Sequence, residues 1–438
     1  MKIIVLGAGI IGISTAWHLL ERGHEVVVVV DRQSQAAQET SFANAAQISV
    51  SYCEPWAHKG APLKALQWMF SAQAPLLFCP QWPLGKGWQQ YRWGLQFLAQ
   101  CNDAAFERNV QQLVALGRYS HAALKDVVQA TGIEYHRLEK GIAHYFTDSK
   151  EFDAAAREAS LMQKYGVERR VVSRDELVKI EPALAPFSSQ IAGGTFTASD
   201  ESGDARVFTE KLAALCAQRG AQMLWAHDVE GLHKMANTLD SVTVRARDTG
   251  ARQTLRADAV VVACGSYSAP LLRTVGVDLP VYPGKGYSAT LALLKPQAAP
   301  LVSMIDDDKK IAISRLGHQL RVAGTIEVGG YDLSLTSALS QTRCQMLLDR
   351  VELVLPGVAD TRSAAQGGQP HLWCGLRPAT PTNIPYIGRT QVAKLWVNTG
   401  HGTLGWTHGA GSGKAIAELI TGARPAMAFN CYGYESPA

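Results

Sequence analysis

The sequence predicts an α/β protein (α+β overall) with two domains. One is a discontinuous, Rossmann-like dinucleotide-binding domain, and the other is built on a mixed sheet with a helical insertion. Three observations predict this. A strand–turn–helix–strand pattern occupies residues 2–31, further apolar strands appear at 259–265 and 395–400, and strand patterns dominate 280–370. With 438 residues, the chain is long enough for two buried cores.

The most specific motif follows the first strand, where Gly7-Ala8-Gly9-Ile10-Ile11-Gly12 reads G-x-G-x-x-G. In such a turn the first glycine permits the bend, the second lets the backbone approach a pyrophosphate, and the third lets the helix pack on the strand. The strand at 26–30 then leads to Asp31, an acid about twenty residues beyond the glycines, which would accept hydrogen bonds from ribose hydroxyls. The pattern predicts a bound dinucleotide, NAD or FAD; the alternative is a turn without a ligand.

Residues 51–100 are rich in aromatic side chains. They hold five of the ten tryptophans, at positions 56, 68, 82, 88 and 93, and also Met69 and Phe70. Two interpretations stay open. The segment is an irregular part of the second domain with its own aromatic core, or it presents a patch within 56–98 that contacts a lipid surface or a quinone, since tryptophan favours the bilayer interface.

The remaining patterns place helices at 105–165, 203–222 and about 340–355, and strands at 241–244 and 259–265. Apolar strands near the start, middle and end of the chain suit a single sheet, so the two domains interleave. We predict a dinucleotide-binding domain from 1–50, 200–280 and 385–438, and a substrate domain from 51–199 and 281–384.

Composition excludes several classes of protein. A net charge of +4 without a run of Lys or Arg does not suit a nucleic-acid partner. The eight cysteines form no C-x-x-C pair and no metal-ligand spacing with histidine, so we expect reduced thiols and no metal site. No export signal precedes the first strand, and no apolar run reaches eighteen residues. We expect a cytoplasmic protein, with possible peripheral contact at the inner membrane.

Residues 398–407 form a glycine-rich loop before a helix that we expect to start near Gly411. Such a loop places backbone N–H dipoles against an electron-rich ring. A flavin needs this, because a hydride arriving at N5 leaves negative charge on the N1/O2 side. The loop favours FAD over NAD, so we expect the first domain to bind FAD; the alternative is a loop that only packs the domains together.

Arg377 lies in the sequence Gly375-Leu376-Arg377-Pro378. An arginine held between a tight turn and a proline is well placed to bind a carboxylate with its planar, bidentate fork. The alternative is an arginine in a structural ion pair.

These motifs together resemble the bacterial D-amino-acid dehydrogenase small subunit, a family that belongs with the glycine, sarcosine and D-amino-acid oxidases. The resemblance runs nearly end to end and rests on Gly7–Gly12, Ser41–Ala45, Val281–Ser288, Lys310–Arg315, Gly375–Pro378 and Gly400–Thr407. It implies non-covalent FAD and oxidative deamination of D-amino acids to 2-oxo acids and ammonia, by hydride transfer from Cα to flavin N5. It also implies that a membrane quinone accepts the electrons.

The resemblance also implies roles for individual residues. The candidate catalytic residues are Arg377 as carboxylate anchor, Tyr52 and Tyr287 near the substrate, and His401, for which a packing role is the alternative. The candidate FAD-binding residues are Gly7, Ala8, Gly9, Ile10, Ile11, Gly12, Asp31, Arg32, Ser41, Asn44, Ala45, Ala46, Gln47, Val229, Cys264, Gly265, Gly400, Gly402, Thr403, Leu404, Gly405 and Trp406.

The chain departs from the usual family pattern at Ala46, where the family has glycine, and at Gly284, where it has leucine. Cys374 offers the alternative of covalent flavin attachment, against a buried thiol. Two other functions stay open: an amino- or imino-acid oxidase that uses oxygen, including one for D-proline-type substrates, and a low-turnover flavin-binding subunit of a membrane complex.

Overall fold

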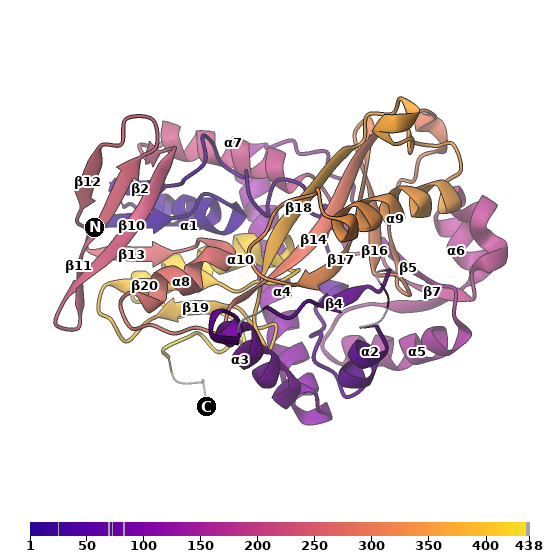
Figure 1. Cartoon of the computed structure of the whole chain (residues 1–438), viewed down its shortest axis with the longest axis horizontal. Coiled ribbons are helices and arrows are strands. Elements are labelled where there is room, and N and C mark those ends of the chain that lie inside the picture. The colour runs from indigo at the N-terminus through magenta and orange to yellow at the C-terminus, as the bar shows by residue number, and fades with distance from the viewer. Residues whose placement is uncertain (25, 69–70, 72, 82–83, 435–438) are drawn as a thin grey trace.

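The computed structural model describes residues 1–24, 26–68, 71, 73–81 and 84–434. Figure 1 shows two bodies side by side, a six-stranded sheet with its helices on the left and a nine-stranded sheet with its helices on the right. The predicted fold class, a Rossmann-like domain beside a mixed-sheet domain, is confirmed.

Three distant parts of the chain build the six-stranded sheet. In spatial order its strands are β19 (Tyr386–Arg389), β20 (Leu395–Thr399), β13 (Ala259–Val262), β1 (Lys2–Leu6), β2 (Val26–Val30) and β9 (Gln222–Leu224). Neighbouring strands run parallel except β19, which is antiparallel to β20. The limits assigned above to the two domains stay a prediction.

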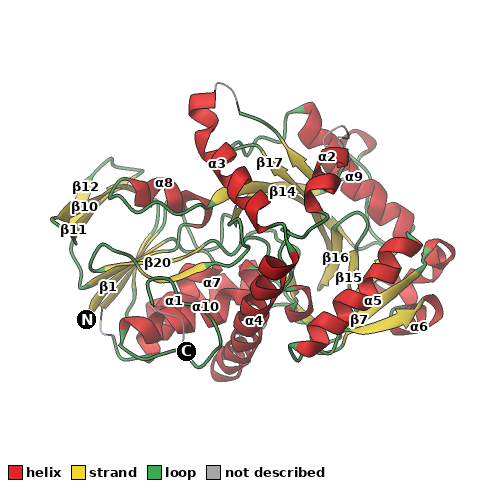
Figure 2. Cartoon of the chain, turned by 90° about the horizontal axis from the view of Figure 1, so that it is seen from below, coloured by secondary structure: helices red, strands yellow, loops and turns green. Residues whose placement is uncertain are grey.

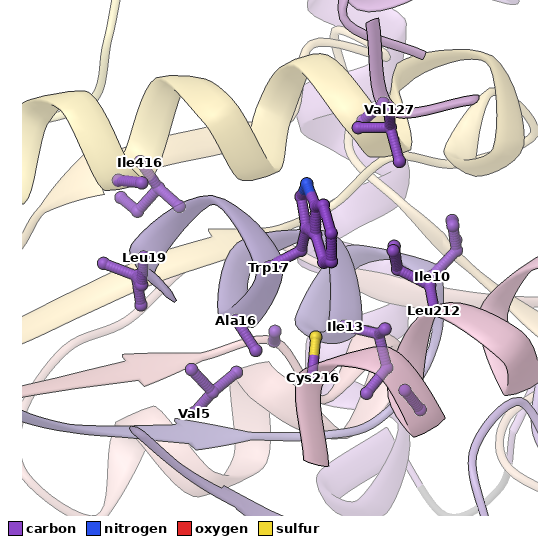
Figure 3. Packing of buried hydrophobic residues seen from close by; sticks show 14 of the residues in the cluster. Val5, Ile10, Ile13, Ala16, Trp17, Leu19, Val127, Leu212, Cys216 and Ile416 are labelled. Atoms are coloured by element: carbon purple, nitrogen blue, oxygen red, sulfur yellow. The ribbon is translucent and has the colours of Figure 1, made fainter. Parts of the chain in front are cut away.

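The central strands are apolar throughout because both faces of the sheet are covered. Along β1, Ile3 and Val5 belong to the core on one face, whereas Ile4 and Leu6 belong to the core on the other. The first face carries helices α1 (Ile10–Glu21), α7 (Ala205–Gln218) and α10 (Gly405–Ile420), and Figure 3 shows Trp17 at the centre of their side chains. The second carries β10 (His227–Met235), β11 (Thr238–Ala246), β12 (Arg252–Leu255) and α8 (Ser268–Arg273).

Helix α10 begins at Gly405, so the predicted start near Gly411 is wrong. Gly411 and Gly413 serve close helix packing instead. A Cβ on Gly411 would lie 2.4 Å from Cα of Ser120, and one on Gly413 would lie 2.5 Å from the carbonyl carbon of Ser14 in α1. Gly411 and Gly413, which the sequence places at a helix start, therefore lie within α10 where it packs closely against α4 (Asp103–Thr131) and α1.

The nine-stranded sheet is mixed. Its strands run in the order β18 (His371–Ala379), β14 (Tyr282–Ala292), β17 (Gln319–Val328), β16 (Ile311–Leu316), β15 (Ser303–Asp306), β5 (Ile142–Phe146), β7 (Gly193–Thr197) and β6 (Arg170–Ser173), and β4 (Leu76–Phe78) pairs with β17. The β15–β5 and β17–β4 pairs are parallel and the others are antiparallel. Helices α9 (Ala338–Val354) and α6 (Arg174–Ile180) pack on this sheet, and β3 (Gln47–Ile48) pairs separately with β8 (Glu201–Ser202).

The continuous helical region predicted for 105–165 is wrong in its middle. Helix α4 (Asp103–Thr131) ends at Gly132, whose φ of +66° is the left-handed conformation typical of a helix C-terminus. The buried strand β5 follows, and only then helix α5 (Ser149–Lys164). The aromatic sequence Ile-Ala-His-Tyr-Phe of β5 suits a strand buried on both sides.

The aromatic segment has a buried part, as the first interpretation predicts, and exposed apolar side chains; the predicted contact with lipid or quinone stays a prediction. It forms helix α2 (Ala61–Trp68), β4 and helix α3 (Leu84–Gln100), which Figure 2 shows on the outside of the molecule beside β14 and β17. Trp93 is buried, stacks on Phe97 and donates from Nε1 to the Ala379 carbonyl at 2.9 Å. The exposed large apolar side chains are Leu63, Trp88, Leu95 and Leu98, each more than half exposed. Residues Met69, Phe70 and Trp82 lie outside the described residues.

Candidate active site

A cavity of about 470 Å³ lies between the two sheets. Among the predicted site residues, Ala8, Gly12 and Gly400 do not line it, and all the others do. The dinucleotide end is formed by the β1–α1 turn, the end of β2, and β10. The other end, here called the sheet end, is formed by Tyr52, Lys310, and residues of β14, β16, β17 and β18. The fold thus brings the two sets of predicted residues to one cavity.

The glycine turn has the close contacts that a dinucleotide-binding turn requires. Gly7 has a φ of +104°, and a Cβ on Gly12 would lie 1.8 Å from the Gly7 carbonyl oxygen. The Ile10 N–H at the start of α1 donates to Ser41 Oγ at 3.0 Å. This helix N-terminus, with its free N–H groups, faces the cavity and suits a phosphate.

Asp31 follows β2 and lines the same end of the cavity. Its carboxylate accepts hydrogen bonds from the Ala8 N–H at 2.6 Å and the Gln33 N–H at 2.8 Å. Burial raises the pKa of Asp31, and these two hydrogen bonds oppose that shift. The neighbouring Arg32 donates to Glu39 and lies 3.9 Å from the ring centre of Tyr267. Sequence reasoning missed Glu39 and Tyr267, because no local motif connects them to the glycine turn.

The loop after Ser41 reaches the middle of the cavity. Ala46 adopts a left-handed φ of +61°, and its N–H donates to Asn44 Oδ1 at 2.9 Å. Its carbonyl accepts from the Gly203 N–H at 2.8 Å. An alanine therefore occupies a backbone conformation that favours glycine, at the position where the chain departs from the family pattern.

Ala46→Gly is expected to raise the free energy of unfolding by about 0.5–1 kcal/mol. Relief of left-handed strain, about 1–2 kcal/mol, exceeds the entropy that glycine adds to the unfolded chain, about 0.4–1 kcal/mol. Urea unfolding of the apoprotein measures the change. Ala45→Gly is the matched control, since Ala45 is not among the residues with positive φ and should lose stability. Equal losses in both variants would contradict the strain at Ala46.

Arg377 lies on β18, opposite Gly284 of β14, and lines the sheet end of the cavity. Its Nη1 donates to the Thr325 carbonyl at 2.8 Å. Within the described part of the chain no carboxylate lies within ion-pair distance of it, so the structural ion pair considered above is not formed there. Burial lowers the pKa of Arg377 to about 10, which leaves it charged at neutral pH. A partly buried cation on a cavity wall, with a carbonyl but no carboxylate as its partner in the described residues, is a site for an anion.

The two predicted tyrosines differ in their surroundings. The Tyr287 hydroxyl donates to Glu327 at 2.8 Å and lies 3.1 Å from Ser340 Oγ of α9. Because Ser340 belongs to α9, the Tyr287 hydroxyl points to the α9 side of the sheet. The neighbouring residue Gly286 faces the opposite side, toward Arg377, since successive side chains of a strand alternate between its faces. The Tyr52 hydroxyl has no hydrogen-bond partner among the described residues, and burial raises its pKa to about 12.

A cluster of charges lies next to Tyr52, in which Asp307 and Arg169 are buried and Lys310 is exposed. Asp307 forms an ion pair with Lys310 and accepts from His144 Nδ1 at 2.8 Å. Burial alone would raise the pKa of Asp307, but the Lys310 charge and the His144 hydrogen bond hold it far below its usual range. Beside this pair, Arg169 donates to Glu54 at 2.7 Å. Sequence reasoning quoted Lys310 in a motif but missed its ion pair with Asp307, three residues away in the same turn. It also missed His144, Arg169 and Glu54, which come close to that turn only in the folded sheet.

Asp307→Asn is expected to lower the free energy of unfolding by about 1–2 kcal/mol at pH 7, because it removes the buried carboxylate that pairs with Lys310 and accepts from His144. The pKa of Asp307 is depressed on folding. Its contribution is therefore complete above the unfolded carboxyl pKa of about 4 and is lost as the pH falls further. Urea unfolding at pH 7 and near pH 3 should show that the stability difference between this variant and the unsubstituted protein is smaller at the lower pH. Asp175→Asn, at an exposed ion pair, is the control and should change little at either pH.

The C-terminal loop closes the cavity. Gly402, Thr403 and Leu404 line it directly before α10, so a second helix N-terminus meets the cavity. His401 also lines it, and neither ring nitrogen has a partner among the described residues. Burial lowers the pKa of His401 well below its ordinary value, so the ring is neutral. Cys374 does not line the cavity, and its thiol donates to the Leu333 carbonyl.

The whole chain matches a known family. Residues 2–419 match the family model described as "FAD dependent oxidoreductase". The chain belongs to this family. It is 45% identical over 429 residues to a D-amino acid dehydrogenase of Dechloromonas aromatica (strain RCB), covering 98% of this chain and 99% of the relative. A D-amino acid dehydrogenase of Methylobacterium nodulans is 41% identical, with 98% and 97% covered.

Solved structures of this fold include glycine oxidase from Bacillus cereus ATCC 14579, with a TM-score of 0.70, 24% identity, and 96% and 95% of the two chains covered. L-proline dehydrogenase from P. horikoshii gives a TM-score of 0.69 at 18% identity, with 97% and 94% covered. At these identities the likeness concerns the fold. The family resemblance predicted from the motifs is confirmed.

The cofactor of this family is FAD, and the cavity fits it. Two helix N-termini meet one cavity, Gly7 and Gly12 leave no room for side chains in the turn, and Asp31 offers a carboxylate. The α1 turn and Ser41 would hold the pyrophosphate, and residues 402–404 would lie at the flavin. That FAD is bound without a covalent link stays a prediction. None of the described helices is both long and apolar enough to span a bilayer.

Proposed function

We propose that the protein oxidises D-amino acids to 2-oxo acids and ammonia. The observation that carries the proposal is the Arg377 guanidinium, a partly buried cation without a carboxylate partner in the described residues, on the wall of the same cavity as the dinucleotide turn. The names of the two relatives, D-amino acid dehydrogenases, support the D configuration. When bound, FAD supplies the redox chemistry by accepting a hydride from the substrate Cα.

Arg377 would bind the substrate carboxylate and so set the position of Cα relative to the flavin. The cavity wall around it is made of small residues, Gly286, Gly324, Ala312 and Ala323, which leaves room for a side chain. The carboxylates that line the cavity, Asp31, Glu39 and Asp228, all belong to the dinucleotide end, among the described residues. The amine would therefore lose its proton to water, and the imino acid product would hydrolyse after release. His401 is a neutral candidate partner for the substrate or the flavin ring.

An anaerobic flavin spectrum, titrated with a panel of D- and L-amino acids, tests this function. We expect D-amino acids to bleach the visible flavin band, with slow reoxidation by air and fast reoxidation by a quinone analogue. Fast reoxidation by oxygen with hydrogen peroxide would indicate an oxidase instead. A protein that stays yellow with every amino acid, D-proline included, would support a flavin-binding subunit without turnover and contradict the proposal.

We also propose that the electrons pass to a quinone at a membrane surface. Among the described side chains of α2 and α3, the exposed large apolar ones are Leu63, Trp88, Leu95 and Leu98, here called the α2–α3 patch. Trp88, Leu95 and Leu98 recur at helical spacing, so they share one side of α3. Such a stripe suits the interface of a bilayer, where an aromatic ring and aliphatic side chains enter the headgroup region.

Replacing Trp88, Leu95 and Leu98 together by serine is expected to weaken binding to vesicles of anionic lipid by at least about tenfold, from the lost apolar burial. Vesicle flotation measures this, and D-alanine oxidation with a soluble dye should not change. The control is Met235→Ser with Leu353→Ser, two exposed apolar positions elsewhere. If the triple variant floats as well as this control, the α2–α3 patch is not the membrane contact.

A further inference from the structure

The guanidinium of Arg377 rests on a local irregularity of the nine-stranded sheet. We propose that Gly286 and Thr325 are positioning residues that fix the orientation of this guanidinium, and with it the place where a substrate carboxylate binds. The proposal rests on the function proposed above for Arg377. It adds two residues that neither the dinucleotide motif nor the Arg377-Pro378 sequence identifies.

Gly286 of β14 provides the space. A Cβ at this position would lie 2.0 Å from Nη1, 2.3 Å from Cζ and 2.5 Å from Nη2 of Arg377. All three atoms belong to the guanidinium plane, so that plane lies directly on the Gly286 backbone. Any side chain at position 286 would have to lift the guanidinium off the sheet.

Thr325 of β17 provides the anchor. It has a φ of +55°, a conformation that a β-branched residue rarely adopts. The residue is buried, and its Oγ1 has no hydrogen-bond partner among the described residues. This conformation turns the Thr325 carbonyl toward Arg377, and the carbonyl accepts a hydrogen bond from Arg377 Nη1 at 2.8 Å. Strain of this kind persists where the surrounding structure requires it, and it is concentrated at functional sites.

The two residues belong to one bulge. Lys285 pairs with Glu327 and Tyr287 pairs with Gly324, so Thr325 and Ile326 together stand opposite the single residue Gly286. A bulge bends the strand and turns one peptide group away from the ladder. Here the turned group is the Thr325 carbonyl, and it points at the guanidinium that Gly286 accommodates.

The arrangement leaves most of the Arg377 donors to the cavity. One Nη1 hydrogen is used by Thr325, and no other hydrogen bond of the guanidinium is formed within the described residues. The guanidinium plane rests on Gly286, and its Nη1 is hydrogen-bonded to the Thr325 carbonyl. The remaining N–H groups of Arg377 therefore point in one fixed direction. Bidentate binding of a carboxylate requires such an orientation.

The test compares Gly286→Ala with Gly284→Ala in the FAD-loaded enzyme. Gly284 lies on the same strand and the same face, but a Cβ there is 3.2 Å from Ile326 and meets only the main chain and Cβ of Arg377. The probe is pyruvate, the carboxylate product expected from D-alanine, titrated by calorimetry, with pyruvamide as the ligand that lacks the carboxylate. We expect Gly286→Ala to raise the Kd of pyruvate and the KM for D-alanine by at least about tenfold, with kcat changed less. Gly284→Ala should change neither by more than about threefold.

Thr325→Gly removes the strain at this residue, so the melting temperature should not fall, and a fall would contradict the strained carbonyl on which the positioning role depends. Arg377→Met separates the two proposals. If it leaves pyruvate binding intact, the proposed function of Arg377 fails. If it abolishes binding but Gly286→Ala behaves as Gly284→Ala does, the positioning role fails. In the Arg377→Met background, Gly286→Ala should have no further effect on pyruvate binding, and a further loss there would also overturn the positioning role.

Discussion

Arg377→Met is expected to lower kcat/KM for D-amino acids by about a thousandfold, or about 4 kcal/mol, because the substrate carboxylate then enters a buried site without its cation. Arg377→Lys keeps the charge but loses the planar fork, so KM should rise by about tenfold. Both variants should bind FAD normally, since the dinucleotide end of the cavity does not depend on this side chain. Steady-state kinetics with a soluble electron acceptor measures both effects.

Arg315→Met is the control for these variants. Arg315 lies on β16 of the same sheet, donates to the Gly317 and Pro296 carbonyls, and does not line the cavity. Its replacement should leave KM unchanged. An unchanged KM in Arg377→Lys, or a loss in Arg315→Met as large as that in Arg377→Met, would remove Arg377 from the role of carboxylate anchor.

Gly12→Ala is expected to weaken FAD binding by at least about a hundredfold, or ~2.7 kcal/mol. A Cβ at this position would lie 1.8 Å from the Gly7 carbonyl oxygen, so the turn and α1 must separate, and the N–H groups that face the pyrophosphate move with them. Overpacking of this kind also lowers the free energy of unfolding by about 3 kcal/mol. Titration of the apoprotein with FAD and urea unfolding measure the two effects separately.

Gly94→Ala is the matched control, the same substitution within a helix. A Cβ on Gly94 would lie 3.8 Å from Phe78, which is ordinary contact, so this variant should bind FAD normally and gain up to about 1 kcal/mol in stability. If Gly12→Ala binds FAD as tightly as Gly94→Ala does, the close contact between Gly12 and Gly7 is not what holds the dinucleotide turn.

Local patterns were sufficient for the first part of the fold. The apolar strands at 2–6 and 26–30 and the glycine turn between them could be predicted, because their signals lie within about thirty consecutive residues. The sheet does contain strands from the start, middle and end of the chain, as predicted. The start of α10 could not be predicted, since Gly411 and Gly413 resemble a helix start until Ser120 and Ser14 are seen to pack against them.

The site, like the fold, was predictable only where local motifs mark it. Motif and family resemblance pointed to Arg377 and to the residues around the glycine turn, and most of these line one cavity. Resemblance did not reveal that the Tyr287 hydroxyl points toward Ser340 of α9. It also did not reveal the cluster beside Tyr52, because the turn that holds Asp307 and Lys310 meets His144 of β5 only through the pairing of β15 with β5.

The sequence by itself determined the dinucleotide turn, the family and the apolar strands of the first sheet, because these depend on motifs whose residues lie close together along the chain. Only the tertiary structure decided that Arg377 has no ion-pair partner in the described residues, and that Gly286 and Thr325 hold its guanidinium. The physical reason is that charge pairing and backbone strain depend on which strands become neighbours. The register that sets Gly286 opposite Thr325 and Ile326 is a property of the folded sheet, and no local pattern of residues encodes it.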